Sequence, residues 1–211
     1  MLMLNDRADK YVWGDDDFEI EPAPPAKSVD LPIKSYSDTR ALFKGTIYGY
    51  IDAAQKDEST RRSFGSSMRT ALTRAGTQTM FDALEDGGVK VESFDADQLK
   101  LFRDWQSEQS GYVTDFGNEI FKQGITENET RLRTDFWVNK SLDNLYYRAL
   151  GLVAGSRKYT WRLGGTVDHC ATCLENNGQT KTLKEWQKQG LPKSHELECG
   201  GWLCDCGLIE A

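Results

Sequence analysis

The chain carries, at residues 126–153, the stretch TENETRLRTDFWVNKSLDNLYYRALGLV. It opens with a capping box, Thr126 followed three residues later by Glu129, which satisfies the free amides of a helix start. Apolar residues then recur at steps of three and four, the period of an α-helix; they are Leu132, Phe136, Leu142, Leu145, Ala149, Leu152 and Val153. About 28 helical residues would span roughly 40 Å. Because a small bundle does not need so long a rod, we expect it to reach a second module or a neighbouring subunit.

Upstream of this stretch, the same period predicts three more helices. The first is capped by Ser37, the second follows Ser59 and ends at Gly87-Gly88, and the third begins near Asp95 or Asp97 and ends at Gly124. We expect their apolar faces to form the core: Phe43, Ile47, Tyr50, Ile51 and Ala54; Phe64, Met68, Ala71, Leu72 and Ala75; Leu99, Phe102, Trp105, Tyr112, Val113, Phe116 and Ile120. Residues 37–155 are therefore predicted to be a helical domain.

Residues 1–36 differ in composition from the rest of the chain. They hold four of the five prolines and the acidic run Asp15-Asp16-Asp17. Proline removes backbone donors and disfavours helix at the residue before it, so we expect an extended, Pro-rich acidic arm. A passive tail and a docking arm are both compatible with this composition. The docking alternative would place Tyr11, Trp13, Phe18 and Ile20 on a partner.

Overall composition excludes several classes of protein. The aromatic content, 11%, argues against disorder along the whole length. No run approaches 18 apolar residues, so a transmembrane helix is not expected, and the first residues do not resemble a signal peptide. A formal net charge of −7 gives no support to binding nucleic acid by wholesale phosphate neutralisation. A local basic patch would still be compatible with that total.

All five cysteines lie between Cys170 and Cys206, and the only two histidines, His169 and His195, lie in the same window. Because five is odd and no secretion signal is evident, a disulfide framework fits poorly and a metal site fits well. Two alternatives remain open. The thiols could be reduced and buried, or Cys170-x-x-Cys173 could be a redox pair, although no βαβ pattern surrounds it.

Structural zinc takes four ligands, usually sulfur or imidazole. Cys170 and Cys173 form the first ligand pair; from the second segment we prefer Cys204 and Cys206, with Cys199 as the substitute. His169 and His195 are alternative ligands; we expect each to lie beside the ion as a hydrogen-bond donor or to be exposed. Residues 158–163 predict a short strand, and few large apolar residues follow, so zinc would supply stability that burial cannot. The fold class is therefore mainly α: an elongated helical region followed, over residues 156–211, by a small, irregular, zinc-stapled α+β module.

A catalytic metal is less well supported by the sequence. A deaminase would need His-x-Glu ahead of its Cys-x-x-Cys, which is missing. An HNH-type nuclease would need a His base beside the zinc knuckle, and neither histidine lies in such a signature. From Ser156 to Ala211 basic and acidic residues number seven each, so this segment has no surplus of positive charge for binding DNA.

The C-terminal residues resemble a known family. The pattern is Trp161-Arg162, then Asp168-His169-Cys170-x-x-Cys173, Asn177-Gly178, Trp186, Gly190, Leu197-Glu198-Cys199-Gly200-Gly201 and Cys204-Asp205-Cys206. It is similar to the head morphogenesis (minor head) proteins of tailed bacteriophages, the group that includes the Mu F-like proteins. Many members end in His-Pro-x-Cys-Arg-Cys, whereas here Asp205 stands between the last two cysteines. The resemblance is specific over residues 159–208 and is one of helical pattern alone before them.

This resemblance implies a virion protein that assists capsid assembly near the portal rather than turning over a substrate. Its implied partners are the portal protein and the major capsid protein, and self-association is expected as well. DNA contact is possible, but the charge gives it no support. Two alternatives belong to other classes: a metal-dependent nuclease or other DNA-processing enzyme associated with packaging, and a zinc-ribbon interaction module that acts in host regulation. Cleavage of DNA with added metal would identify the first. A stable complex with a host protein, together with absence from phage particles, would identify the second.

Overall fold

The computed structural model describes residues 35–123, 125–165, 168–201 and 204–211. The elements run in the order α1 (Tyr36–Gln55), α2 (Arg61–Asp86), α3 (Ala96–Asn118), the π-helical turn η1 (Glu119–Gln123), α4 (Glu127–Val153), β1 (Lys158–Arg162), α5 (Ala171–Asn176), β2 (Thr180–Thr182), α6 (Leu183–Gln189) and β3 (Gly207–Glu210). The fold is thus mainly α with a small α+β part at the C-terminus, as predicted. The expected extended arm lies, up to residue 34, outside the described residues.

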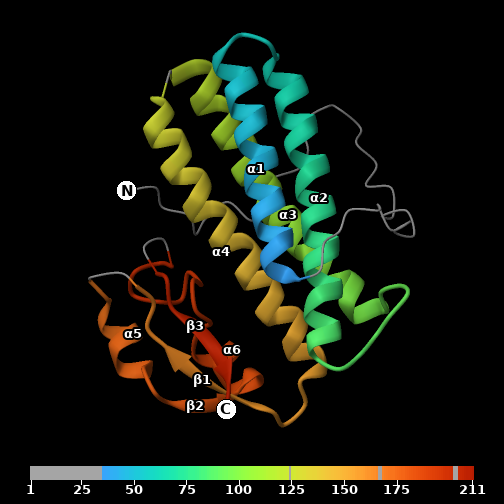
Figure 1. Cartoon of the computed structure of the whole chain (residues 1–211), viewed down its shortest axis with the longest axis vertical. Helices are drawn as coiled ribbons and strands as arrows, with labels where there is room; N and C mark the ends of the chain where they lie inside the picture. The colour runs from blue at the N-terminus through green and yellow to red at the C-terminus, as the bar shows by residue number, and fades with distance from the viewer. Residues whose placement is uncertain (1–34, 124, 166–167, 202–203) are drawn as a thin grey trace.

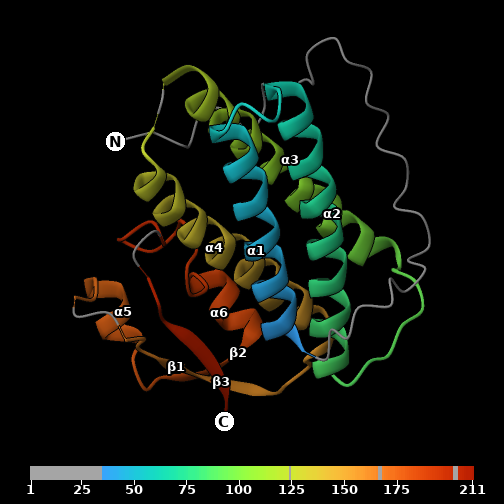
Figure 2. The same cartoon turned by 45° about the horizontal axis from the view of Figure 1, so that its top comes forward.

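Helices α1 to α4 pack lengthwise into the body of the molecule, and the C-terminal module lies against the C-terminal part of α4 (Figure 1). A second view shows α1 and α2 side by side, with α3 and α4 completing the bundle (Figure 2). The long helix predicted at residues 126–153 therefore joins the two parts of the fold.

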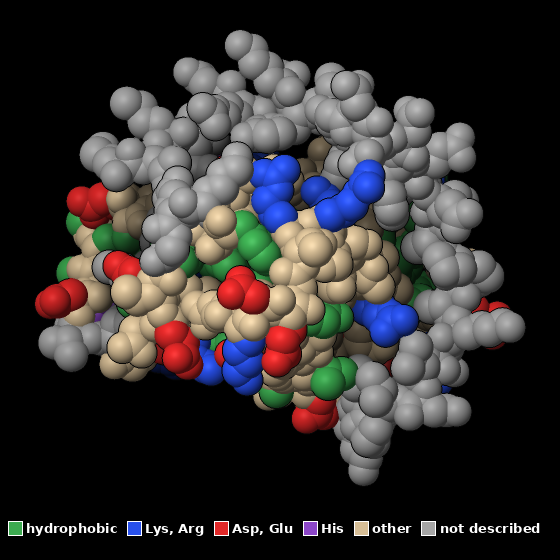
Figure 3. Space-filling model, turned by 90° about the horizontal axis from the view of Figure 1, so that it is seen from above, with side chains coloured by type: hydrophobic (Ala, Val, Ile, Leu, Met, Phe, Trp, Pro, Cys, Tyr) green, Lys and Arg blue, Asp and Glu red, His purple; other side chains and the backbone are tan. Residues whose placement is uncertain are grey.

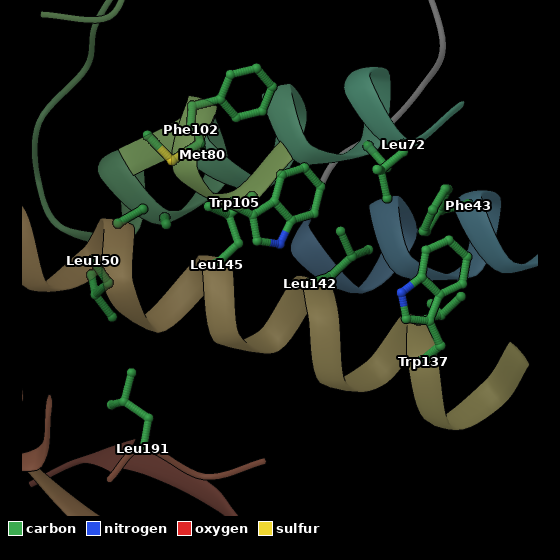
Figure 4. Close-up of a cluster of buried hydrophobic side chains, with 14 of the residues drawn as sticks. Phe43, Leu72, Met80, Phe102, Trp105, Trp137, Leu142, Leu145, Leu150 and Leu191 are labelled. Atoms are coloured by element: carbon green, nitrogen blue, oxygen red, sulfur yellow. The ribbon is translucent and has the colours of Figure 1, made fainter. Parts of the chain in front are cut away.

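The centre of the bundle is aromatic. Trp105 of α3 is fully buried, stacks on Phe102 with ring centroids 5.9 Å apart, and donates its indole N–H to the carbonyl of Ser141 on α4 at 3.1 Å. Figure 4 shows this indole above Leu142 and Leu145. A Cβ on Gly76 would lie 2.3 Å from the Trp105 ring, so the glycine allows α2 to approach the indole closely.

The inward face of α4 differs in part from the predicted one. Leu142, Leu145 and Ala149 are buried as expected, but Leu132 and Leu152 are 57% and 46% exposed. Trp137 turns inward near the start of the helix and donates its indole N–H to the Gln109 side chain at 2.8 Å. A polar side chain on α3 thus satisfies the tryptophan, which the apolar spacing alone did not indicate.

Helix starts were predicted to within two residues. The Thr126 cap is confirmed, and of the two starts left open for the third helix, Asp95 is the cap. Each has a capping box closed by the residue three positions on. The cap expected at Ser37 is instead Ser35, which accepts from the Asp38 amide. The second helix, expected to follow Ser59, is capped by Thr60, which pairs reciprocally with Ser63. Each side chain satisfies an otherwise unpaired amide of the first turn.

The C-terminal module is built on a three-stranded antiparallel sheet in the order β2-β1-β3. The central strand β1 agrees with the predicted strand, whereas the two outer strands were not predicted. The sheet has its own aromatic centre, because Trp161 and Trp186 are fully buried with ring centroids 5.3 Å apart. Trp186 also donates its indole N–H to the Tyr159 carbonyl at 2.8 Å, which fixes α6 on the sheet.

The end of the molecule that carries the α1–α2 connection has a mixed surface. Among the described residues there, Lys and Arg side chains are interspersed with Asp and Glu (Figure 3). No helix within the described ranges combines the length and apolar character that crossing a bilayer requires.

Candidate metal centre

The first cysteine pair is positioned by the start of a short helix. Cys170 is the N-cap of α5, and Cys173 lies in its first turn, where it is buried. A Cys-x-x-Cys at a helix start directs both sulfurs to the same side. The start of α5 is tied to the second cysteine segment by the carboxylate of Glu198, which accepts the Ala171 amide at 2.7 Å, and by the Glu198 amide, which donates to the Thr172 hydroxyl at 3.4 Å.

A tight loop places Cys199. Gly200 and Gly201 follow it with φ of +59° and +74°, in the left-handed region that favours glycine. A Cβ on Gly201 would lie 2.3 Å from the Lys193 carbonyl oxygen. Only glycine therefore fits at this point, where the backbone of residue 201 passes close to that of residue 193. The loop is held to the helical body because Lys140 of α4 donates to the Gly200 carbonyl at 2.6 Å.

The last two cysteines lead into β3. Cys206 directly precedes the strand and is buried, while Cys204 is half-buried. Between them, the Asp205 carboxylate accepts the Gly165 amide at 3.2 Å, which ties this segment to the chain that leaves β1. The resemblance places a basic residue at this position; here the acidic side chain makes a structural hydrogen bond.

All five cysteines meet in one cluster. Their sulfurs form two triplets, Cys170–Cys173–Cys199 and Cys173–Cys204–Cys206, within each of which every pair lies within 4.8 Å. The Cys173 and Cys204 sulfurs are 3.6 Å apart. Zinc–sulfur bonds of about 2.3 Å in a tetrahedron place neighbouring sulfurs about 3.8 Å apart. The spacing within each triplet and the all-sulfur donor set therefore fit thiolate ligation of a metal ion.

The surroundings of three of the five cysteines favour the neutral thiol. Burial raises the pKa of Cys199 to about 11, and burial together with neighbouring sulfurs raises the pKa values of Cys173 and Cys204. At Cys170 burial also opposes ionisation, but hydrogen bonds from Cys173 and Cys199 outweigh it and lower the pKa. A bound cation would reverse this balance, because metal ligation deprotonates thiols outright.

The two histidines behave differently. His169 lies beside the cluster, with its Nδ1 4.0 Å from the Cys206 sulfur. His195 is exposed and faces Glu196, 3.5 Å away, rather than the cysteines. Cys204 and Cys206, the preferred partners of the first cysteine pair, share a triplet with Cys173, whereas Cys170 shares its triplet with Cys199. Cys199, expected only as a substitute, is also in the cluster.

A polar hub next to the cluster was not predicted. Asp143, in the middle of α4, accepts from Tyr36 and Lys193, and Arg40 lies 3.3 Å away. The hub borders a cavity of about 600 Å³ between the helical body and the module, which is also lined by Tyr146, Tyr147 and Cys206. The sequence offered one signal: Asp143 directly follows Leu142 on the inward face, and an acid at such a place needs a partner.

One face of α4 carries the contacts to the module. Lys140 and Asp143 bind Gly200 and Lys193 of the loop over residues 190–201, which contains Cys199 and is called the cysteine loop below. The Tyr147 hydroxyl accepts a hydrogen bond from the Leu208 amide of β3 at 3.0 Å. Gly151, one turn further, lies so close to Gln187 of α6 that a Cβ would lie 2.3 Å from its amide nitrogen. Spacings of three and four place these residues along a single stripe.

Comparisons with family models, with curated proteins and with solved structures found no match to this chain.

Proposed function

We propose that this chain is a minor head protein of a tailed bacteriophage, in which a zinc-bound C-terminal module is held at the end of a helical body. The cysteine cluster is the observation that carries the proposal. The Cys-x-x-Cys and Cys-x-Cys segments, whose spacing resembles the head morphogenesis family, lie together on a module that follows a helical region. That layout is the one the resemblance implies.

Zinc is the metal that best suits these donors. Thiolates in tetrahedral arrangement select zinc or iron–sulfur chemistry, and the two triplets contain only sulfur. Zinc brings no redox chemistry, which suits a site whose task is to hold segments together. The four ligands of a structural ion would come from the five cysteines, and His169 would lie beside them.

The proposed role is structural. Cys170 and Cys173 would be joined through the ion to the loop before β3, so that metal closes a module whose sheet has only three short strands. Below about 70–80 residues a domain rarely gains enough from its core alone, and metals commonly supply the remainder. The module would then present a fixed surface to the portal and major capsid proteins, within the virion and during assembly in the host.

The decisive experiment is quantitative mass spectrometry of purified procapsids and mature heads from the source phage. A few to tens of copies per particle are expected for a minor head protein. Absence from both particles would refute the assignment. Cleavage of DNA by the purified chain with Mg²⁺, Mn²⁺ or Zn²⁺ would replace it with the nuclease alternative.

The zinc assignment has a separate test. A Cys170→Ser/Cys173→Ser variant should lose bound metal and the local order of the module, while most of the helical circular dichroism survives. The matched control is His195→Ala, because His195 is exposed and outside the cluster. Full metal retention in the double cysteine variant would contradict the assignment.

A further inference from the structure

The cysteine cluster has more sulfurs than one tetrahedral ion uses, and they are divided in a specific way. Cys170 and Cys199 belong to one triplet, Cys204 and Cys206 to the other, and Cys173 belongs to both. A single ion would need four sulfurs mutually about 3.8 Å apart. The arrangement is instead that of two three-sulfur sites sharing a corner.

We propose that the cluster holds two thiophilic metal ions, bridged by the thiolate of Cys173. This inference rests on the proposed zinc centre and adds a second ion to it. One ion would be bound by Cys170, Cys173 and Cys199, and the other by Cys173, Cys204 and Cys206. The central position of Cys173 supports its role as bridge, since it is buried in the first turn of α5 and lies in both triplets.

Charge supports a second ion. Loading two Zn²⁺ ions onto five thiols releases five protons to solvent and leaves a cluster charge of −1. With one Zn²⁺, five thiolates would leave a charge of −3 in a partly buried site, or a surplus thiol would have to remain protonated. Buried uncompensated charge is costly, so the second cation stabilises the fully ionised cluster.

The two ions would differ in their surroundings. Cys173 and Cys206 are buried, and the His169 Nδ1 lies 4.0 Å from the Cys206 sulfur, so a turn of the imidazole would supply a fourth donor to the ion on that side. Cys170 and Cys199 are only half-buried. The ion they hold would take water or an outside donor as its fourth ligand, and it should exchange faster than the enclosed ion.

The first test is the number of metal ions per chain. The full-length protein is unfolded or stripped with a chelator, reconstituted with Zn²⁺ under reducing conditions, and examined by native mass spectrometry with elemental analysis. We expect two ions per chain. One ion would overturn the bridged pair and leave the proposed zinc centre intact, whereas none would refute both.

Single-cysteine variants distinguish a bridged pair from one ion with a spare ligand. Cys199→Ser and Cys206→Ser should each reduce the loading from two ions to one, because each belongs to a different triplet. If one ion uses four of the five cysteines, the wild-type protein itself carries one ion, so neither variant can show a fall from two ions to one. Helical circular dichroism of each variant confirms that the body remains folded.

Cadmium substitution tests the bridge itself. With ¹¹³Cd²⁺ in both sites, we expect two resonances that couple through the Cys173 sulfur. Two uncoupled resonances would overturn the shared ligand, and a single resonance at full loading would overturn the second site. As a further check, His169→Ala should broaden or shift one resonance and leave the other in place.

Discussion

Lys193 and Asp143 form an ion pair with both side chains buried, 7% and 8% exposed, between the cysteine loop and the middle of α4. Asp143 is also bound by Tyr36, and Arg40 lies 3.3 Å away. One carboxylate therefore connects the first helix, the long fourth helix and the loop that leads to Cys199. Among the residues that the structure describes, Lys193 has one further ion-pair partner, the largely exposed Asp205, 3.9 Å away.

This asymmetry predicts unequal effects of removing each partner. Asp143→Ala should lower the free energy of unfolding by about 3–5 kcal/mol, the range for breaking a buried ion pair, because Lys193 remains buried without its main partner. Lys193→Met should be less damaging, since Arg40 and Tyr36 still satisfy Asp143. Urea unfolding at neutral pH measures both.

The matched control is an exposed ion pair between α1 and α4. Lys44 and Asp135 lie 2.7 Å apart with 39% and 36% of their side chains exposed. Lys44→Met should change stability by less than about 1 kcal/mol, as is usual for surface pairs. An Asp143→Ala protein as stable as this control would show that the hub does not hold the module to the body.

Gly201 provides a test of the loop that positions Cys199. Its φ is +74°, and a Cβ there would lie 2.3 Å from the carbonyl oxygen of Lys193, a backbone atom that cannot move aside. Gly201→Ala should therefore displace the loop and weaken metal binding at least tenfold, as measured by competition with a chromogenic chelator.

Gly178 is the control for this substitution. It has a similar φ of +78°, but nothing lies within 4 Å of its Cβ position. Gly178→Ala should cost only the backbone strain, on the order of 1 kcal/mol, and leave metal affinity unchanged. Equal metal affinity in the two variants would mean that the Gly201 contact does not shape the site.

The helical body was predictable because its signals are local. Capping residues such as Thr126 and Asp95 act on amides three positions away, and the apolar period reports one face of one helix. The error on α4 has a tertiary origin. Trp137 could turn inward because Gln109 of another helix accepts its N–H, and no spacing within residues 126–153 carries that information.

The candidate site was predictable in composition but not in arrangement. The clustering of Cys170, Cys173, Cys199, Cys204 and Cys206 in sequence was enough to predict that they meet. Which sulfurs share a triplet depends on how the loop from Gly190 to Gly201 crosses itself. The Asp143–Lys193 contact joins residues 50 positions apart, so only the folded chain reveals it.

Alkaline pH should reveal the burial of Tyr147. Burial raises the pKa of Tyr147 to about 12, although the hydrogen bond that its hydroxyl accepts from the Leu208 amide lowers this pKa. In the unfolded chain a tyrosine ionises near pH 10, so between about pH 10 and 12 only the unfolded state loses this proton. Stability from this group is complete below pH 10 and should fall by about 1.4 kcal/mol per pH unit above it.

Tyr147→Phe should remove that part of the pH dependence while lowering stability at neutral pH through the lost hydrogen bond. Unfolding free energies from pH 9 to 11.5 give the slope, and absorbance at 295 nm follows tyrosinate formation directly. Tyr112, whose pKa burial also raises to about 12, serves for comparison, because Tyr112→Phe should reduce the slope by a similar amount. An unchanged slope in the Tyr147→Phe protein would contradict the assigned burial.

Removal of metal should loosen the module without melting the body. Among the described residues, two hydrogen bonds to Glu198, at Ala171 and Thr172, link the start of α5 to the segment of Cys199. Without an ion, the repelling or protonated sulfurs add little to these links. Amide hydrogen exchange after chelation should rise at α5 and in the loop around Cys199. The buried turns of α2 and α4 should stay protected, because side chains of the helical bundle such as Trp105, Leu142 and Leu145 hold them without the metal. Between these extremes, β1 should keep partial protection, since Trp161 and Trp186 pack independently of the ion. Uniform loss of protection from α1 to β3 would instead show that metal binding and folding of the whole chain are one cooperative event.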